Sequence, residues 1–259
     1  MNIKNWIKPF ESLPRRDSLI IGASWFFIIC LYWFLVTSGT KKLFPSPVQV
    51  WEGFVSLYNE GLVVHIGSSL LLCLQATIFS IVFSLLIAYS YPVPALRPIA
   101  TAMSKLRYLP LTGITFYLTM LVTDARTMQV WVLVIFMSLY FITSLLGVLK
   151  DISQEEIDHA RSLKCNRWEI LWEVIIKGRF DYVIDVLRQN LAITWMMLVT
   201  VESILVAAGG LGVLIKNSDK FMNHGRILAL QIVILLVGLG IDFTLNTFRK
   251  SLFRYSKFN

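Results

Sequence analysis

Glu202 is the single charged residue in the apolar stretch 189–215. A charged side chain at the centre of a bilayer costs about 3 kcal/mol, so it must face other helices or a polar cavity. Glu202 either lines a solute path or gate, or hydrogen-bonds to a neighbouring helix such as the fourth or sixth span. A carboxylate in the path would repel an anion, which favours the structural or gating role. The glycines that follow, Gly209, Gly210 and Gly212, can unwind the end of this helix and let backbones pack closely.

Motifs for enzymatic chemistry are missing around this acid. The sequence has no G-x-x-x-x-G-K-[ST] and no Gly-Lys dipeptide, so the chain does not hold ATP in a P-loop. H-E-x-x-H and G-x-S-x-G are also absent. The three histidines lie far apart in sequence, and Cys30, Cys73 and Cys165 are scattered, so neither set suggests a metal site or a disulfide framework. We expect a chain that binds no cofactor or metal and is not an enzyme by itself.

A second candidate site is the segment 150–188, in which fifteen of thirty-nine residues are charged, against 15% for the whole chain. Two capping boxes, in which Ser or Asn is followed three residues later by Glu, begin at Ser153 and Asn166. They predict two helices, over 153–164 and 166–176, with a break between them. A doubly capped, charged segment between apolar stretches indicates a preformed helical element in water.

The second of these helices carries aromatic residues on one face. Trp168, Leu171, Trp172 and Ile175 recur at i, i+3, i+4 and i+7. Exposing two tryptophans is costly, so this face contacts a partner or the rest of the protein. Alternatively, it anchors the segment to lipid headgroups, a common use of Trp. The residues alone favour neither interpretation.

The elements around these sites are apolar. The composition is 56% hydrophobic, 13% aromatic and only 15% charged, against about a quarter charged in soluble domains. A membrane helix needs about 20 apolar residues, and nothing in the chain shows the alternation of barrel strands. We predict an all-α integral membrane protein with one domain over 18–248 and six spans, at about 18–38, 66–91, 108–123, 127–149, 189–208 and 227–248.

The distribution of basic residues predicts the topology. With the N-terminus inside, eighteen of the 24 Lys and Arg residues fall on the inner side and six on the outer side. The positive-inside rule then places the termini, 1–17 and 249–259, and the loop 150–188 in the cytoplasm. The net charge of +8 is therefore a topology signal, and a nucleic-acid partner is not expected.

A further helix is predicted between the first two spans, in the stretch FPSPVQVWEGFVSLYNEG. Ser46 begins a capping box, and Pro47 takes the first helical position. An apolar stripe follows at helical spacing, formed by Val48, Trp51, Val55 and Tyr58. This helix either lies on the outer membrane surface or packs on its own protein, and the pattern fits both equally.

The charged loop EEIDHARSLKCNRWEILWEVIIKG, followed by VTVESILVAAGGLGVLI, resembles the permease subunits of binding-protein-dependent ABC importers. The most similar branch is the nitrate, sulfonate, taurine and bicarbonate type. The resemblance runs from about Leu43 to the C-terminus. It implies a six-helix bundle of the type I importer permease kind, with a cytoplasmic coupling helix between spans four and five.

The resemblance also implies site residues. The positions that match the family's coupling motif and the helix after it are Asp158, His159, Ala160, Lys164, Asn166, Arg167, Trp168, Leu171 and Trp172. The family's Glu-Ala-Ala triplet is only partly kept, and Lys164 stands at its Gly position. Since a residue with a side chain cannot use positive φ cheaply, we expect the break between the two helices to be shaped differently here. The departures suggest a divergent branch or a dedicated ATPase partner.

The expected function is transport of a small anionic solute, such as nitrate, a sulfonate or taurine, across the cell inner membrane. The resemblance implies separate ATPase subunits that bind the ATP, an extracytoplasmic solute-binding protein and a second copy of the chain as a homodimer in the bilayer. One alternative is a self-sufficient channel or secondary transporter, which predicts inverted repeats and broken helices that the sequence does not show. Another is a membrane scaffold that recruits a cytosolic partner through Trp168 and Trp172.

Overall fold

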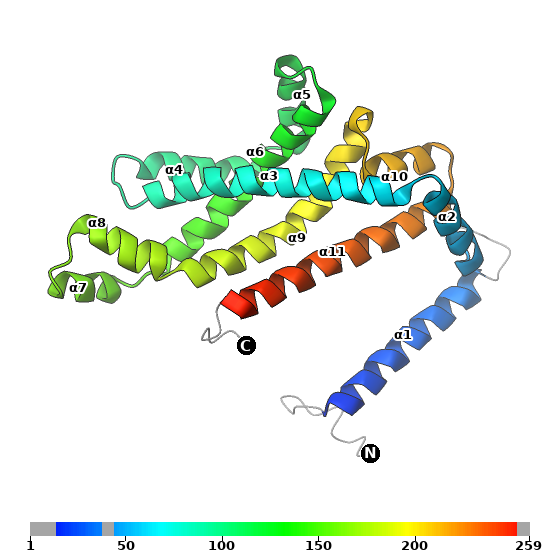
Figure 1. The fold of residues 1–259 in the computed structure, drawn as a ribbon, viewed down its shortest axis with the longest axis horizontal. Helices are drawn as coiled ribbons and strands as arrows, with labels where there is room; N and C mark the ends of the chain where they lie inside the picture. The colour runs from blue at the N-terminus through cyan, green and yellow to red at the C-terminus, as the bar shows by residue number, and fades with distance from the viewer. Residues whose placement is uncertain (1–13, 38–43, 253–259) are drawn as a thin grey trace.

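The fold is described from a computed structural model, which covers residues 14–37 and 44–252 (Figure 1). Of the predicted termini, 1–17 and 249–259, residues 1–13 and 253–259 lie outside the described residues. All regular structure in the described part of the chain is helical. The longer helices are α1 (Arg15–Thr37), α2 (Pro47–Asn59), α3 (Leu62–Ser90), α5 (Leu111–Leu121), α6 (Ala125–Lys150), α9 (Phe180–Ile204), α10 (Leu211–Lys220) and α11 (His224–Leu252).

Shorter elements connect them. These are α4 (Arg97–Lys105), η2 (Leu106–Tyr108), α7 (Gln154–Ser162), α8 (Arg167–Ile170), the π-helix η3 (Leu171–Lys177) and, before α10, the 3₁₀ turn η4 (Val206–Ala208). Figure 1 shows α7 and α8 at one end of the molecule and α2 and α10 toward the other, with α3, α9 and α11 running between the ends.

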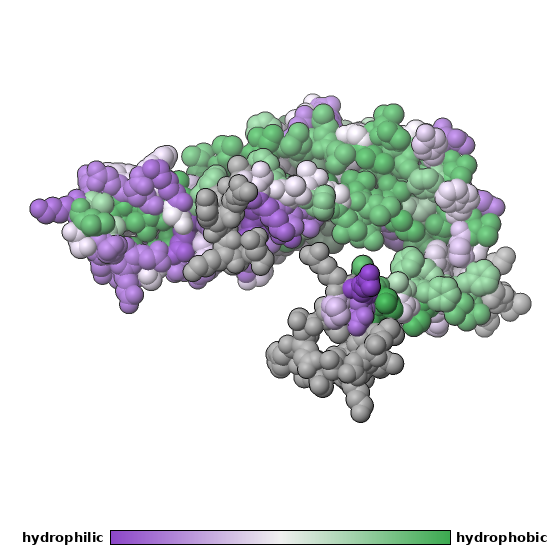
Figure 2. All heavy atoms as spheres, turned by 60° about the horizontal axis from the view of Figure 1, so that its bottom comes forward, coloured by the Kyte–Doolittle hydropathy of each residue, from purple (hydrophilic) through white to green (hydrophobic). Residues whose placement is uncertain are grey.

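Four helices of the described part are long and apolar enough to cross a membrane: α1, α3, α6 and α11. The third predicted span, 108–123, corresponds to the shorter α5. The fifth, 189–208, corresponds to the second half of α9, whose first half carries Asp181, Asp185 and Arg188. The predicted number of six spans therefore stays a prediction. Figure 2 shows hydrophilic residues gathered at the α7–α8 end and a broad hydrophobic surface over the middle of the molecule.

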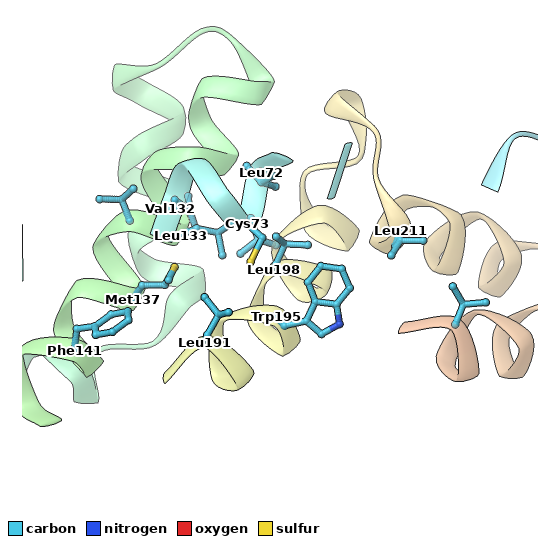
Figure 3. Close-up of a cluster of buried hydrophobic side chains, with 14 of the residues drawn as sticks. Leu72, Cys73, Val132, Leu133, Met137, Phe141, Leu191, Trp195, Leu198 and Leu211 are labelled. Carbon is cyan, nitrogen blue, oxygen red and sulfur yellow. The ribbon is translucent and has the colours of Figure 1, made fainter. Parts of the chain in front are cut away.

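The core lies where α3, α6 and α9 pack together, with α10 and α11 beside them (Figure 3). Small residues recur every four positions on α3, at Ala76, Ser80, Ser84 and Ala88, and all are buried. Small side chains let helix backbones approach closely within a membrane. The hydroxyls of Ser80 and Ser84 donate to the carbonyls of Val134 and Ser138 on α6, each at 3.2 Å. This stripe sets α3 directly against α6.

Candidate functional site

The first candidate site is the α7–η3 loop, defined as residues 151–178. Helix α7 is capped by Ser153, whose Oγ accepts the amide hydrogen of Glu156 at 3.2 Å. The carboxylate of Glu156 binds Arg179, with Nη2 at 2.7 and 2.9 Å from its two oxygens. Arg179 directly precedes α9, so this ion pair connects the loop to the base of that helix. Asp158 and His159 are exposed on α7, and Ala160 is buried.

The break between the two loop helices differs from the expectation for Lys164. This residue has φ of 61°, so it takes the left-handed conformation that the family's glycine position would use. The amide of Lys164 donates to Arg161 O at 2.9 Å, and that of Cys165 donates to Ala160 O at 3.3 Å. These two bonds form a Schellman C-cap. They compensate for the left-handed conformation, which costs an L-residue about 1–2 kcal/mol.

The second loop helix starts at the predicted place. Asn166 and Glu169 form the predicted capping box, in which Glu169 Oε2 accepts the amide hydrogen of Asn166 at 2.6 Å. After one α-helical turn from Arg167 the chain widens into the π-helix η3, and the amide of Gly178 donates to Glu173 O at 3.0 Å, five residues back. This π-helix was not predicted, because its i→i+5 hydrogen bonds have no distinctive spacing of apolar residues in the sequence.

The π-helix divides the aromatic face that the sequence predicts. Trp168 is 69% exposed and Trp172 is 53% exposed. Leu171 is half-buried, whereas Ile170 and Ile175 are buried. The two tryptophans thus stand on the outside of the segment, while the isoleucines are covered within the α7–η3 loop, where α8 and η3 contact α7. Two exposed indoles on a capped segment form a surface suited to a partner or to lipid headgroups.

The second candidate site surrounds Glu202, which is fully buried near the end of α9. Ser69 Oγ on α3 donates to Glu202 Oε1 at 2.7 Å, and the amide of Gly212 donates to Oε2 at 2.9 Å. Ser69 Oγ also accepts the amide hydrogen of Leu211 at 2.9 Å. Glu202 therefore does hydrogen-bond to a neighbouring helix, but that helix is α3, the second predicted span, and not the fourth or sixth span that we named as examples.

The glycines after α9 are required by this geometry. Gly209 and Gly210 have φ of 79° and 116°, so the helix does end where the sequence predicts an opening. A Cβ on Gly210 would overlap the carboxylate of Glu202, and one on Gly212 would overlap Val199 O. Helix α10 therefore begins directly on the Glu202 side chain, which caps its first turn. A negative charge is favoured at that position.

A neighbouring group of polar residues was missed by sequence reasoning. Gln129 on α6 is fully buried, and its Nε2 donates to Leu205 O at 2.9 Å. Arg126 donates from Nη2 to Ser68 O at 2.7 Å and from Nη1 to Gln129 Oε1 at 3.3 Å. Together with Glu202 and Ser69, these residues bind α3 and α6 to the end of α9. The side-chain amide of Gln129, within an otherwise apolar stretch of the sequence, could have indicated this group.

Two ion pairs join α9 to α11 at the other end. Arg188 Nε lies 2.8 Å from Asp242 Oδ1, and Arg249 Nη1 lies 3.0 Å from Asp185 Oδ1. Arg249 is buried. The two candidate sites do not come together, because Glu202 stands 22 positions after Phe180 on α9, roughly 33 Å at 1.5 Å per residue. Helix α9 is the element they share.

Comparisons with known proteins show similarity to membrane transport proteins. The family model of the binding-protein-dependent transport system inner membrane component matches residues 80–254. The taurine transport system permease protein TauC of Escherichia coli (strain K12) is 24% identical over 251 residues, which are 93% of this chain and 90% of that protein.

Two solved structures of the MetNI methionine ABC transporter, both inward-facing, share the fold. They give TM-scores of 0.63 and 0.58 at 14% and 16% identity, and each match covers 73% of this chain and 95% of theirs. These similarities confirm a helical permease fold and a multi-pass protein of the inner membrane. They also agree with the expectation that the chain is a translocation subunit rather than an enzyme.

The matched region runs from within α3 through α11 and includes the α7–η3 loop and Glu202 with the glycines after it, whereas Ser69 lies before it. The chain therefore belongs to the family of binding-protein-dependent transport system inner membrane components, the permease subunits of ABC importers.

Proposed function

We propose that this chain forms, as a homodimer, the translocation path of an importer for a small anionic or sulfonated solute. The similarity to a taurine transport permease over 93% of the chain supports this solute class. The path would be powered by separate ATPase subunits that bind the ATP, and an extracytoplasmic binding protein would deliver the solute. Both termini and the α7–η3 loop would lie in the cytoplasm, in line with the eighteen-to-six distribution of basic residues.

The observation that carries the coupling role is the exposure of Trp168 and Trp172 on a segment capped at Ser153 and Asn166. Aromatic side chains are the commonest anchors in protein interfaces, and a preformed segment loses little entropy on docking. The Glu156–Arg179 ion pair connects the segment to α9. A displacement of the loop by the ATPase would therefore be passed to the helix that carries Glu202 at its far end.

Co-purification tests this role. Replacing Trp168 and Trp172 together with Ala should reduce co-purification of the ATPase at least tenfold, because each buried aromatic anchor contributes about 2 kcal/mol. Membrane insertion should be unchanged. Trp131→Ala serves as a control, since Trp131 is also exposed but lies on α6 outside the loop. Full co-purification with the double variant would show that the two tryptophans anchor the loop to lipid instead.

The solute class is tested separately. Proteoliposomes that contain the permease, its ATPase and its binding protein should take up radiolabelled taurine or another sulfonate, or nitrate, only when ATP is inside. Methionine serves as the comparison solute. Uptake of methionine alone would contradict the proposed solute class while leaving the permease role intact.

A further inference from the structure

Helix α2 connects two helices that are each long enough to cross the membrane, α1 and α3. Consecutive spans run in opposite directions, so the helix between them lies at one membrane surface. The indole Nε1 of Trp33 in α1 donates to Pro45 O, just before α2, at 3.1 Å. Figure 1 shows α2 at the end of the bundle opposite α7 and α8. The position of α2 along the membrane normal is thus set at both of its ends.

One face of α2 packs on the protein. Val50, Gly53 and Leu57 are buried there, against α11. The two helices nearly touch, since a Cβ on Gly225 would lie 2.6 Å from Gln49 O and one on Gly53 would lie 3.0 Å from the backbone of Arg226. An ion pair between Glu60 and Arg226 adds to this attachment. Helix α2 is therefore held rigidly, and its rotation about its own axis is fixed.

A second face of α2 is polar. Gln49, Glu52 and Ser56 line a groove of about 540 Å³, together with Asn223 in the turn before α11 and His224 at the start of α11. On a helical wheel of 100° per residue, this face is centred roughly 100° from the buried one. Its side chains require water or a hydrogen-bonding partner.

The third face is apolar and exposed. Val48, Trp51, Val55 and Tyr58 lie on it, with Trp51 67% and Tyr58 62% exposed. Phe54 stacks on Trp51 with ring centroids 6.0 Å apart. These five positions span an arc of roughly 120° on the wheel, and no charged side chain falls within it. An exposed aromatic arc of this kind marks a contact surface.

We propose that this third face lies in the lipid, at the boundary between headgroups and acyl chains, on the side of the membrane opposite the α7–η3 loop. The three faces match the three environments that meet there: protein, water and lipid. Trp and Tyr are the residues enriched at this depth. Apolar side chains are also exposed on the first turns of α3, at Val63 and Val64, and farther along this span at Leu71 and Leu74. Two residues separate α2 from α3, so α2 lies next to the lipid that surrounds this span.

Spin labels placed around α2 test this proposal in the full-length chain. Cys30, Cys73 and Cys165 are replaced by Ala, and single cysteines are introduced at 51, 55, 52 or 56. The labelled chains are reconstituted in liposomes of phosphatidylethanolamine and phosphatidylglycerol. Labels at 51 and 55 should collide preferentially with oxygen, which concentrates in lipid. Labels at 52 and 56 should collide preferentially with a water-soluble nickel chelate, with the ratio of the two rates differing at least threefold between the pairs.

Two outcomes would overturn the proposal. Equal nickel accessibility at all four positions would place the third face in water. Low accessibility to both reagents at 51 and 55 would show that protein covers it, either a second copy or another part of the chain. A label at Leu74, on the exposed side of α3, gives the lipid reference value. The measurement needs neither ATPase nor solute, so its failure would leave the transport proposal unaffected.

Discussion

Ser69 Oγ lies 2.7 Å from Glu202 Oε1 and joins α3 to α9 across 133 residues of sequence. The same hydroxyl oxygen accepts a hydrogen from the amide of Leu211, and the second carboxylate oxygen accepts one from Gly212. Both oxygens of Glu202 are therefore hydrogen-bond acceptors. The Glu202 side chain thus joins three helices, α3, α9 and α10. Any movement that separates α3 from α10 must break at least one of these hydrogen bonds.

We first predict that Ser69 and Glu202 are energetically coupled. Ser69→Ala leaves a buried oxygen and the Leu211 amide unsatisfied, at about 1–3 kcal/mol each. Glu202→Leu removes the same contact from the other side. The double variant should therefore lose less stability than the sum of the two, as measured by thermal unfolding of the purified chain in detergent. Ser24→Ala is the control, since Ser24 bonds only within α1. Additive losses would contradict the coupling.

The second prediction separates gating from solute recognition. Glu202→Gln can still accept from Gly212 with its oxygen and can donate to Ser69 with its amide, so most uptake should remain. Glu202→Leu leaves its partners without a hydrogen bond and should uncouple ATP hydrolysis from uptake. Both rates are measured in proteoliposomes with the ATPase and binding protein present. If the Gln variant changed the order of solute preference, Glu202 would line the path instead.

The glycines around Glu202 give a third prediction. Gly210→Ala places a methyl group on the carboxylate of Glu202 and forces an alanine to φ of 116°. Gly212→Ala meets the backbone of α9 at Val199. Both variants should lower the yield of folded chain by several-fold, as judged by gel filtration in detergent. Gly67→Ala is the matched control, because nothing lies within 4 Å of a Cβ there. Normal folding of both site variants would show that α10 can move away at low cost.

Local signals in the sequence predicted local structure well. The capping boxes at Ser46 and Asn166 are present as predicted, because a cap depends on residues three positions apart. The opening after α9 follows from the conformational freedom of Gly209 and Gly210. Lys164 shows the limit of such rules, since a favourable C-cap holds a lysine in a left-handed conformation.

Contacts over long sequence distances could not be predicted in this way. Ser69 resembles the other small polar residues of α3, and only the packing against α9 distinguishes it. Asp242 pairs with Arg188 on another helix, 54 positions earlier in the sequence. Such pairs depend on the register between helices, which hydropathy does not specify.

The fourth prediction tests the orientation of the chain. In a chain whose Cys30 and Cys73 are replaced by Ala, a membrane-impermeant maleimide applied to intact cells should not label Cys165 in the α7–η3 loop. The same reagent should label a cysteine introduced at Asn217, which is exposed on α10. Cys165 should become reactive once the cells are permeabilised, which is the control for its accessibility. Labelling of Cys165 in intact cells would invert the topology and remove the α7–η3 loop from the reach of a cytosolic ATPase.

The last prediction concerns the ion pair between Arg188 and Asp242, which joins α9 to α11 at the end nearest the loop. In the proposed coupling, movement of the loop would reach α9 through the ion pair of Glu156 with Arg179. The Arg188–Asp242 pair is one of two ion pairs that would carry this movement on to α11. Arg188→Asp alone brings two acids together. Since the ion pair is partly exposed, this substitution should lower the free energy of unfolding by only about 1 kcal/mol, which lowers Tm by roughly 2–4 °C. Uptake should fall more than stability does, because α11 no longer follows α9. The double variant Arg188→Asp, Asp242→Arg exchanges the two charges and should restore the coupling of ATP hydrolysis to uptake. If coupling is not restored although both helices are folded, the pair of Asp185 and Arg249 suffices to join α9 and α11.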